Sequence, residues 1–493
     1  MSLDAHLPAL LIMLPLVAAP VAVVVRHKTA VWAWATAVSW ATVGIAWQLL
    51  GKVLDQGVVT YHLGGWDPPV GIEYRIDAAN AYVLLLLCSI AAVVFPYARQ
   101  SVDDEVPAER HHLFYAMLLL CQTGLLGMTV TGDAFNVFVF LEISSLSMYG
   151  LIAMGRSPRA LTSAFRYLVL GTIGGTFVLI GIGLAYMATG TLNMFDMAHR
   201  LQEVGANRTV QTAFAFLTVG LSIKLAVFPL HIWLPNAYAF APSVVTAFLA
   251  ATATKVSFYV LLRTVFTVFG VELAFEDLDL AEVLLPLALV GIYVGSLVAC
   301  FESNIKRMLA YSSVAQVGYM VVGLSLANQT GLTGGIAHLF NHALMKGGLF
   351  LVVGCVVYRI GSVKLEDWAG LGRRMPVTMA AFVIGGLSLI GVPLTVGFVS
   401  KWYFVLGALE ADKTWVAVAL LGSSLLAVVY IWRVLEVAYF QPSPEGAEAQ
   451  EAPFWMLLCT WVLIGATVVC GIATDLTAGV ASEAARVLMA GVL

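Results

Sequence analysis

Apolar windows of about 20 residues, separated by short polar stretches, account for nearly all of this 493-residue chain. A helix of that length crosses roughly 30 Å of hydrocarbon. The pattern therefore predicts an all-α polytopic membrane protein without a soluble domain. About fourteen transmembrane helices are expected, at residues 7–25, 31–50, 79–98, 113–131, 133–154, 163–189, 210–239, 243–269, 280–300, 307–327, 331–358, 376–409, 414–440 and 453–474.

The seventh and twelfth windows are too long and too rich in proline to be simple spans. The seventh carries Lys224, followed by Pro229 and Pro235, and the twelfth carries Pro393 and Lys401. Proline removes a backbone donor and clashes with the preceding turn, so it interrupts a helix. Interrupted helices in corresponding positions of two halves are typical of transporters with inverted repeats, and they line a polar cavity.

This pattern divides the chain into four parts. Three N-terminal helices are followed by two groups of five helices, each with one broken helix, and then by a last helix with a short tail. The corresponding ranges are 1–112, 113–269, 280–440 and 441–493.

Composition supports membrane insertion and excludes several other classes. Hydrophobic residues make up 60% of the chain and charged residues only 11%, whereas about a quarter of the residues of a soluble protein are charged. Lys and Arg are concentrated in alternate loops, which predicts those loops to be cytoplasmic and both termini to face outward. A net charge of −4 argues against nucleic-acid partners.

No cofactor or metal site is expected from the motifs. The six cysteines fall inside predicted spans without a CxxC spacing, so they are expected to be buried apolar residues and not a disulfide framework or an iron–sulfur site. The sequence also lacks a GxxxxGK[ST] loop and a cluster of carboxylates suited to an all-oxygen cation site.

Few ionisable residues lie within the predicted spans. A charge in hydrocarbon costs roughly 2.5–3.5 kcal/mol, so such residues usually face a protein interior and have a function. Arg166, Arg263 and Arg433 lie nearer to span ends, and a role as structural anchors stays open for them. The residues that remain are Glu142, Lys224, Lys255, His338, His342, Lys346 and Lys401.

The spacing of these groups points to proton transfer. Glu142 lies about nine residues into its helix, near the middle of the membrane; the alternative is a protonated structural acid bonded to Ser144 or Ser145. His338, His342 and Lys346 follow one another at intervals of four, and therefore form one stripe on a helix face. Imidazole exchanges protons near neutral pH, and a buried lysine, unlike arginine, can become neutral. The pattern favours a path for protons over bond-breaking chemistry.

These residues occur in motifs that resemble a known family. The motifs lie at 132–142, 224–237, 306–313, 338–346 and 391–401. Together they are similar to the antiporter-like membrane subunits shared by Mrp-type multisubunit cation/proton antiporters, respiratory complex I and membrane-bound hydrogenases. The resemblance extends over essentially the whole chain.

The resemblance implies a fourteen-helix core with two inverted five-helix repeats and a hydrated central axis. By match to the family, Glu142 and Lys224 are the essential acid–lysine pair, Lys255 is the bridging residue and Lys401 is the outlet lysine. The stripe of two histidines and a lysine matches the middle relay.

The best match within the family is the D-type subunit of Mrp antiporters. The chain has lysine at position 401, where one complex I member carries glutamate, and only residues 481–493 remain beyond the last span, too few for a long lateral helix. We therefore expect a proton-translocating subunit of a sodium/proton antiporter, not an enzyme, in the inner (plasma) membrane of a bacterium or archaeon. Its expected partners are other hydrophobic subunits, the lipid bilayer, protons and sodium.

Three alternatives stay open at this point. The same subunit could belong to a redox-driven complex I-like or hydrogenase complex, or to an inorganic-carbon uptake complex. It could also be a structural membrane anchor without a transport role. The anchor predicts that the buried charges are dispensable.

Overall fold

The computed structural model describes residues 3–443 and 450–490, and these residues are almost entirely helical. The α-helices are α1 (Leu7–Val24), α2 (Lys28–Gln56), α3 (Ala78–Glu105), α4 (His111–Val130), α5 (Ala134–Ala153), α6 (Pro158–Thr189), α7 (Met194–Val204), α8 (Arg208–Leu225), α9 (Leu234–Phe240), α10 (Ser243–Leu262), α11 (Leu280–Phe301), α12 (Ile305–Ser325), α13 (Gln329–Ile360), α14 (Leu371–Arg374), α15 (Pro376–Ile390), α16 (Val396–Glu410), α17 (Thr414–Phe440), α18 (Phe454–Ile472) and α19 (Ala478–Met489). A π-helical segment, Arg263–Phe269, continues α10.

The predicted fold class is confirmed. Within the described residues, 12 helical segments are long and apolar enough to cross a membrane, and each coincides with one predicted span. The other two predicted spans are the broken ones. The seventh is divided into α8 and α9, and the twelfth into α15 and α16. That the second five-helix unit is inverted relative to the first stays a prediction.

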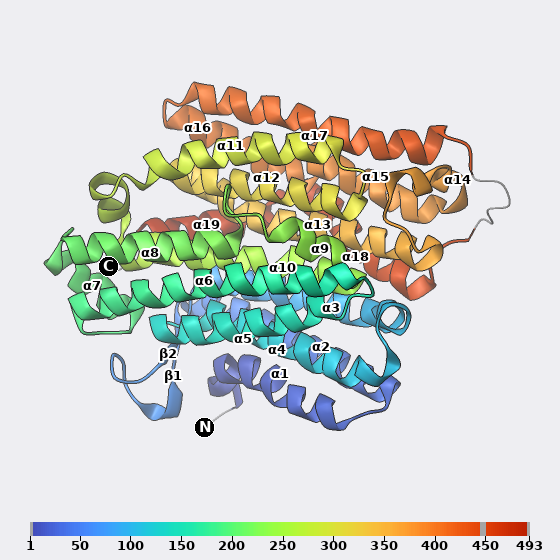
Figure 1. The fold of residues 1–493 in the computed structure, drawn as a ribbon. Coiled ribbons are helices and arrows are strands. Elements are labelled where there is room, and N and C mark those ends of the chain that lie inside the picture. The colour runs from blue at the N-terminus through green and yellow to red at the C-terminus, as the bar shows by residue number, and fades with distance from the viewer. Residues whose placement is uncertain (1–2, 444–449, 491–493) are drawn as a thin grey trace.

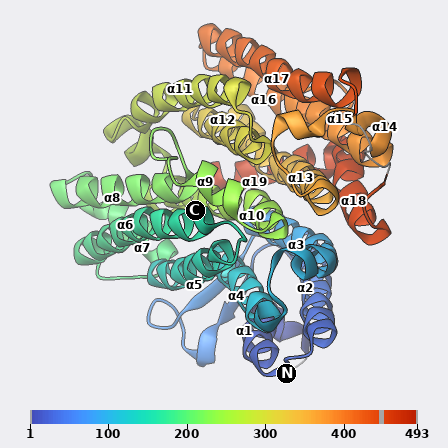
Figure 2. The same ribbon diagram turned by 45° about the vertical axis from the view of Figure 1, so that its right-hand side comes forward.

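The helices form a bundle in which chain order is largely kept in space. Figure 1 shows α1 to α5 on one side, α11, α16 and α17 on the other, and the green helices between them. Figure 2 places α10 in the middle of the bundle, where it packs against α3, α8 and α13, and α13 in turn packs against α12, α16, α18 and α19. Helices α10 and α13 therefore join the two halves of the molecule.

Glycine residues allow the close approach of α6 and α8. A Cβ added to Gly220 would lie 2.8 Å from the Gly174 carbonyl oxygen, and one added to Gly174 would lie 3.2 Å from the Gly220 oxygen. Small residues let membrane helices approach closely where lipid gives no hydrophobic drive for association. This contact fixes the end of α8 that carries Lys224.

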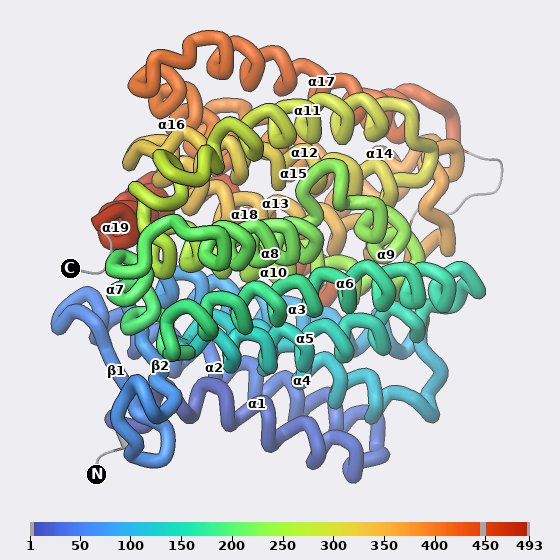
Figure 3. Tube along the Cα trace, turned by 60° about the vertical axis from the view of Figure 1, so that its left-hand side comes forward, coloured from blue at the N-terminus to red at the C-terminus, as the bar shows by residue number. Residues whose placement is uncertain are grey.

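Several short elements were not predicted from the hydrophobic pattern. Strands β1 (Val59–His62) and β2 (Glu73–Ile76) form an antiparallel hairpin, α7 is a short amphipathic helix, and α19 occupies most of the region expected to be a tail. Figure 3 shows the hairpin and α19 at the same end of the bundle, where the first and last described residues also lie. This agrees with termini on one side of the membrane; which side stays a prediction.

Candidate functional site

Glu142 and Lys224, the predicted acid–lysine pair, lie next to each other. Glu142 is on α5 and Lys224 is in the last turn of α8. Lys224 Nζ lies 3.8 Å from Glu142 Oε1 and donates a 2.8 Å hydrogen bond to Ser145 Oγ. Lys224 is buried, whereas 26% of the Glu142 side chain is exposed. The carboxylate therefore lies between the ammonium and a more accessible space.

The alternative role of Glu142 as a protonated acid bonded to a serine is not what the geometry shows. Ser144 Oγ donates to the Leu141 carbonyl, and Ser145 Oγ accepts from Lys224. Within the described part of the chain, Glu142 Oε1 has no hydrogen-bond partner. A buried carboxylate oxygen without a donor is costly. This oxygen is therefore placed to accept a hydrogen bond from Lys224 or to bind a proton.

Gly175 on α6 makes room for the Glu142 carboxylate. A Cβ at this position would lie 2.3 Å from Glu142 Oε1. Any side chain larger than hydrogen would force the carboxylate away from its present place.

The break after α8 is satisfied by groups of the same segment. Ala226 ends α8 in the left-handed conformation, with φ of 64°. The Ser222 carbonyl accepts from Val227 N at 2.9 Å, and the Ile223 carbonyl accepts from Trp233 Nε1 at 2.9 Å. The last carbonyls of a helix need such partners. Lys224 is therefore free to direct its ammonium toward α5.

Lys255 is fully buried on α10, at the junction of the two halves. Its ammonium donates to the Ala250 carbonyl and, at 3.3 Å, to Thr254 Oγ1. Among the residues that the structure describes, no carboxylate lies within ion-pair distance of Lys255, although its helix packs against α13. An ammonium without a counterion at this depth is expensive, which is typical of a functional group.

The predicted stripe on α13 is present and fully buried. The rings of His338 and His342 are parallel within 4°, with centroids 5.6 Å apart. His338 Nδ1 lies 2.8 Å from Ser400 Oγ, whereas neither ring nitrogen of His342 has a partner within the described residues. Lys346 Nζ donates to the Leu309 carbonyl at 2.8 Å and to Ser312 Oγ. Both rings thus keep at least one nitrogen available for a proton.

Lys401 on α16 binds the end of α15, the other half of its broken helix. Lys401 Nζ donates to the Ile390 carbonyl at 2.7 Å and to Ser424 Oγ at 2.9 Å. A positive charge at a helix C-terminus is stabilised by the helix dipole. The ammonium also lies 5.2 Å above the Tyr319 ring, whose centroid is 6.0 Å from that of His338. Tyr319 therefore lies between Lys401 and the stripe.

The hydroxyl partners were missed by sequence reasoning. Each amine or imidazole of the predicted path, except His342, has a hydroxyl nearby, and these belong to Ser145, Thr254, Ser312, Ser400 and Ser424. A serine in an apolar helix usually bonds to its own backbone, so no signal in a single sequence singles these out.

Two of the three arginines left open are structural anchors. Arg263 forms a buried ion pair with Asp77, which also caps α3, and Arg433 donates to the Cys300 carbonyl. Arg166 lines a small surface pocket with Arg159 and Arg307. None of the three lies among the buried amines and imidazoles.

The chain is similar over nearly its full length to known membrane proteins. Residues 131–427 match the family described as NADH:quinone oxidoreductase/Mrp antiporter, transmembrane. The N-type subunit of the NADH-quinone oxidoreductase of Desulforudis audaxviator is 44% identical, over 92% of this chain and 90% of that protein. The D-type subunit of the Na(+)/H(+) antiporter of Alkalihalophilus pseudofirmus is 29% identical, over 86% of this chain and 85% of that protein.

The fold is also similar to that of a solved structure. A chain of the Mrp complex from Dietzia sp. DQ12-45-1b superposes with a TM-score of 0.90 at 25% identity, over 99% of this chain and 98% of that chain.

Proposed function

This chain belongs to the family of NADH:quinone oxidoreductase and Mrp antiporter membrane subunits, and from that premise we propose that it moves protons across the membrane along its buried amines and imidazoles. The observation that carries the proposal is the placement of Lys255. It is fully buried without a carboxylate partner in the described residues, on α10, which packs against both α8 and α13.

The acid–lysine pair acts as a switch in this proposal. Lys224 Nζ is shared between Ser145 Oγ at 2.8 Å and Glu142 Oε1 at 3.8 Å. Shortening the distance to Glu142 stabilises the charged lysine, and lengthening it favours release of the proton toward Lys255.

The second half of the path uses groups that can each hold one proton. His342 and His338 exchange it through their free ring nitrogens, and Lys346 holds a neighbouring charge against α12. Lys401 receives the proton next to the carbonyls that end α15, where a positive charge is favoured. Every step transfers a proton between existing groups, and no covalent bond of a substrate changes.

We place the chain in a hetero-oligomeric membrane complex driven by electron transfer in partner subunits. The support is its 44% identity to an NADH-quinone oxidoreductase subunit, against 29% to a sodium/proton antiporter subunit. Sodium/proton antiport is the second candidate, because the backbone superposes on the Mrp complex chain with a TM-score of 0.90.

Proton movement in inside-out vesicles from a host that expresses the full gene cluster tests the proposal. We expect Glu142→Ala and Lys224→Ala to abolish it, with the complex still assembled. Lys364→Ala, at a lysine whose side chain is 68% exposed, is the matched control. Unchanged proton movement in the first two variants would show that the buried charges are not part of the mechanism. It would favour the alternative that the chain is a structural membrane anchor.

The same vesicles distinguish the two candidate energy sources, electron transfer and sodium exchange. An electron donor with a quinone should start proton uptake in the redox-driven complex, and a sodium pulse should start it in the antiporter. Proton movement after a sodium pulse alone would overturn the redox assignment and support the second candidate.

A further inference from the structure

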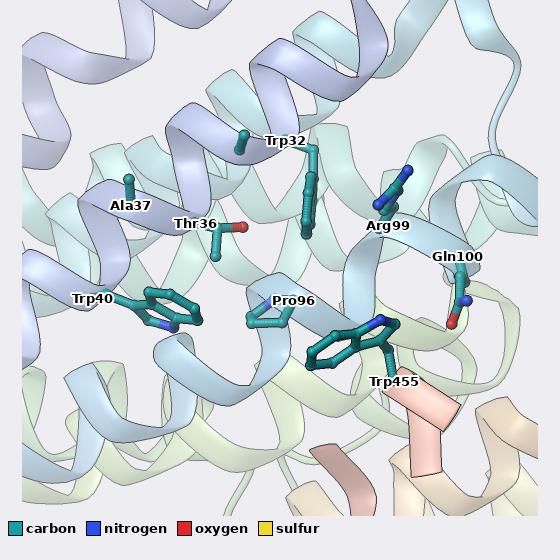
Figure 4. Close-up of a pocket in the computed structure, with 9 residues that line it drawn as sticks. Trp32, Thr36, Ala37, Trp40, Pro96, Arg99, Gln100 and Trp455 are labelled. Carbon is teal, nitrogen blue, oxygen red and sulfur yellow. The ribbon is translucent and has the colours of Figure 1, made fainter. Parts of the chain in front are cut away.

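A surface pocket of about 350 Å³ lies between α2, α3 and α18, away from the buried charges. Figure 4 shows the rings of Trp32, Trp40 and Trp455 around Pro96, which is at the centre of the view. Trp40 is 57% exposed and Trp455 58%. The walls are thus large apolar rings that are open to the surroundings of the bundle.

Hydrogen bonds to α3 hold two of these rings, and Pro96 frees the carbonyl that binds Trp40. A proline inside a helix cannot donate to the carbonyl four residues earlier, and here that carbonyl belongs to Ala92. Trp40 Nε1 donates to the Ala92 oxygen at 2.9 Å, and Trp32 Nε1 donates to the Phe95 oxygen at 3.0 Å. Both indoles of α2 are therefore attached to α3 by their polar edges and present their apolar faces to the pocket.

One end of the pocket carries an unpaired positive charge. The Arg99 guanidinium lies 4.9 Å from the centroid of the Trp32 ring. The acids in the next turn have other partners: Asp103 pairs with Lys28 at 3.5 Å, and Asp104 pairs with Arg156 at 3.3 Å. Within the described ranges, 3–443 and 450–490, Arg99 has no carboxylate partner, so its N–H groups are available to an anion.

Two buried polar atoms of the pocket lack partners in the protein. They are Thr36 Oγ1 and Gln100 Oε1, and no hydrogen bond within the described residues satisfies either. Buried polar atoms are nearly always hydrogen-bonded. The pocket therefore combines apolar walls with buried polar atoms that lack hydrogen-bond partners.

These features are ordered by depth. Arg99 is about 9 Å from the end of α3 at Glu105, and on α2 the distance from Lys28 is about 12 Å for Thr36 and about 18 Å for Trp40, at 1.5 Å per residue. On α2 and α3 the charge lies near the helix ends, the hydroxyl lies deeper, and the exposed ring of Trp40 lies deepest. That gradient matches a lipid headgroup, its ester linkage and its acyl chain.

We propose that this pocket binds one anionic glycerophospholipid whose headgroup carries a hydroxyl group. The phosphate lies against Arg99, and the headgroup hydroxyl donates to Gln100 Oε1. The Thr36 hydroxyl donates to an ester carbonyl, and an acyl chain packs on Pro96 and Trp40. A transmembrane helix of another subunit is the competing occupant; an apolar helix would leave the positive charge unpaired.

Native mass spectrometry of the delipidated complex, titrated with phosphatidylglycerol or phosphatidylcholine, tests this. We expect phosphatidylglycerol to bind at least tenfold more tightly than phosphatidylcholine, because only the first has a net negative charge and a headgroup hydroxyl. Arg99→Gln should lower that affinity about tenfold, since it removes a charge-assisted hydrogen bond. Thr36→Val, of nearly the same shape, should lower it by about threefold to fivefold.

Two control variants guard against general effects of charge or of aromatic surface. Arg110→Gln removes an exposed arginine outside the pocket, and Trp47→Ala removes a 67% exposed indole further along α2; neither should change the affinity. Equal binding of the two lipids, or wild-type affinity in Arg99→Gln, would overturn the proposal.

A crosslinking measurement identifies the occupant in cells, independently of purified lipid. The photoreactive variant Ala37→p-benzoylphenylalanine places the probe in the pocket of the assembled complex. A mass increase equal to one phospholipid supports the proposal. A covalent adduct with another subunit would overturn it in favour of a protein contact.

Discussion

Lys224 donates its short hydrogen bond to Ser145 and not to Glu142, although the carboxylate oxygen is only 3.8 Å away. A lysine bonded directly to a carboxylate in a low-dielectric site is held firmly in its charged form. The hydrogen bond to the hydroxyl leaves the ion pair with Glu142 loose. In our account this looseness lets the pair open and close as a proton passes.

Removing the Ser145 hydroxyl should therefore slow transport. In Ser145→Ala, Lys224 loses its closest acceptor and moves onto Glu142, which tightens the ion pair. A net hydrogen bond of about 1 kcal/mol corresponds to a rate loss of about fivefold. Proton uptake by vesicles measures the effect. A rate equal to that of wild type would show that the hydroxyl does not control the pair.

Gly175 and Gly183 on α6 offer a matched pair of substitutions. A Cβ at Gly175 would lie 2.3 Å from Glu142 Oε1, whereas a Cβ at Gly183 would meet nothing within 4 Å. We expect Gly175→Ala to displace the carboxylate and lower proton transport at least tenfold, and Gly183→Ala to leave it unchanged. Equal activity in the two variants would contradict the place assigned to the Glu142 carboxylate.

His338 and His342 should act in series. The parallel rings are 5.6 Å apart on one helix face, so a proton that passes one must also pass the other. His338→Ala and His342→Ala should each block transport, and the double variant should be no slower than the slower single one. Losses that multiply in the double variant would indicate two parallel routes.

Lys401 combines a structural role with the proposed proton transfer, and Lys401→Arg separates them. Arginine can still donate to the Ile390 carbonyl, but it does not lose its proton. We therefore expect an assembled complex with little proton transport. Lys401→Met should also lower the yield of assembled complex, because the carbonyls that end α15 lose their cationic donor. Normal transport by Lys401→Arg would exclude Lys401 from the path.

Asp77 and Arg263 should matter for stability and not for transport. Their buried ion pair joins the start of α3 to the segment that follows α10. Removing one partner of a buried pair costs about 3–5 kcal/mol, because the other charge is left unpaired. Arg263→Met should lower the amount of complex recovered after mild heating, with proton movement per recovered complex unchanged. A loss of transport at full recovery would place Arg263 in the path.

The sequence predicted the framework because each predicted feature carries a strong local signal. A 20-residue apolar window has one stable structure in a bilayer, and Pro229 and Pro393 mark the two breaks directly. Lys224, Lys255 and Lys401 stand out because charge is rare and costly within spans.

The partners of these groups leave no such signal. Ser145 and Ser400 resemble any serine that bonds to its own helix, and only the fold brings them to Lys224 and His338. The hairpin of β1 and β2 has too few residues for a periodic pattern, and the bonds from Trp32 and Trp40 to α3 depend on the packing of two helices. Contacts between distant segments therefore had to come from the structure.

The most direct test of the account is proton uptake through the assembled complex with Lys255→Met. This lysine has no ion-pair partner in the described residues and joins the two halves of the path, and methionine keeps its length and its fit in the core without carrying a proton. We predict a loss of at least tenfold at normal assembly, with Lys364→Met unchanged as the control. Wild-type uptake by Lys255→Met would contradict a proton path through the centre of this protein.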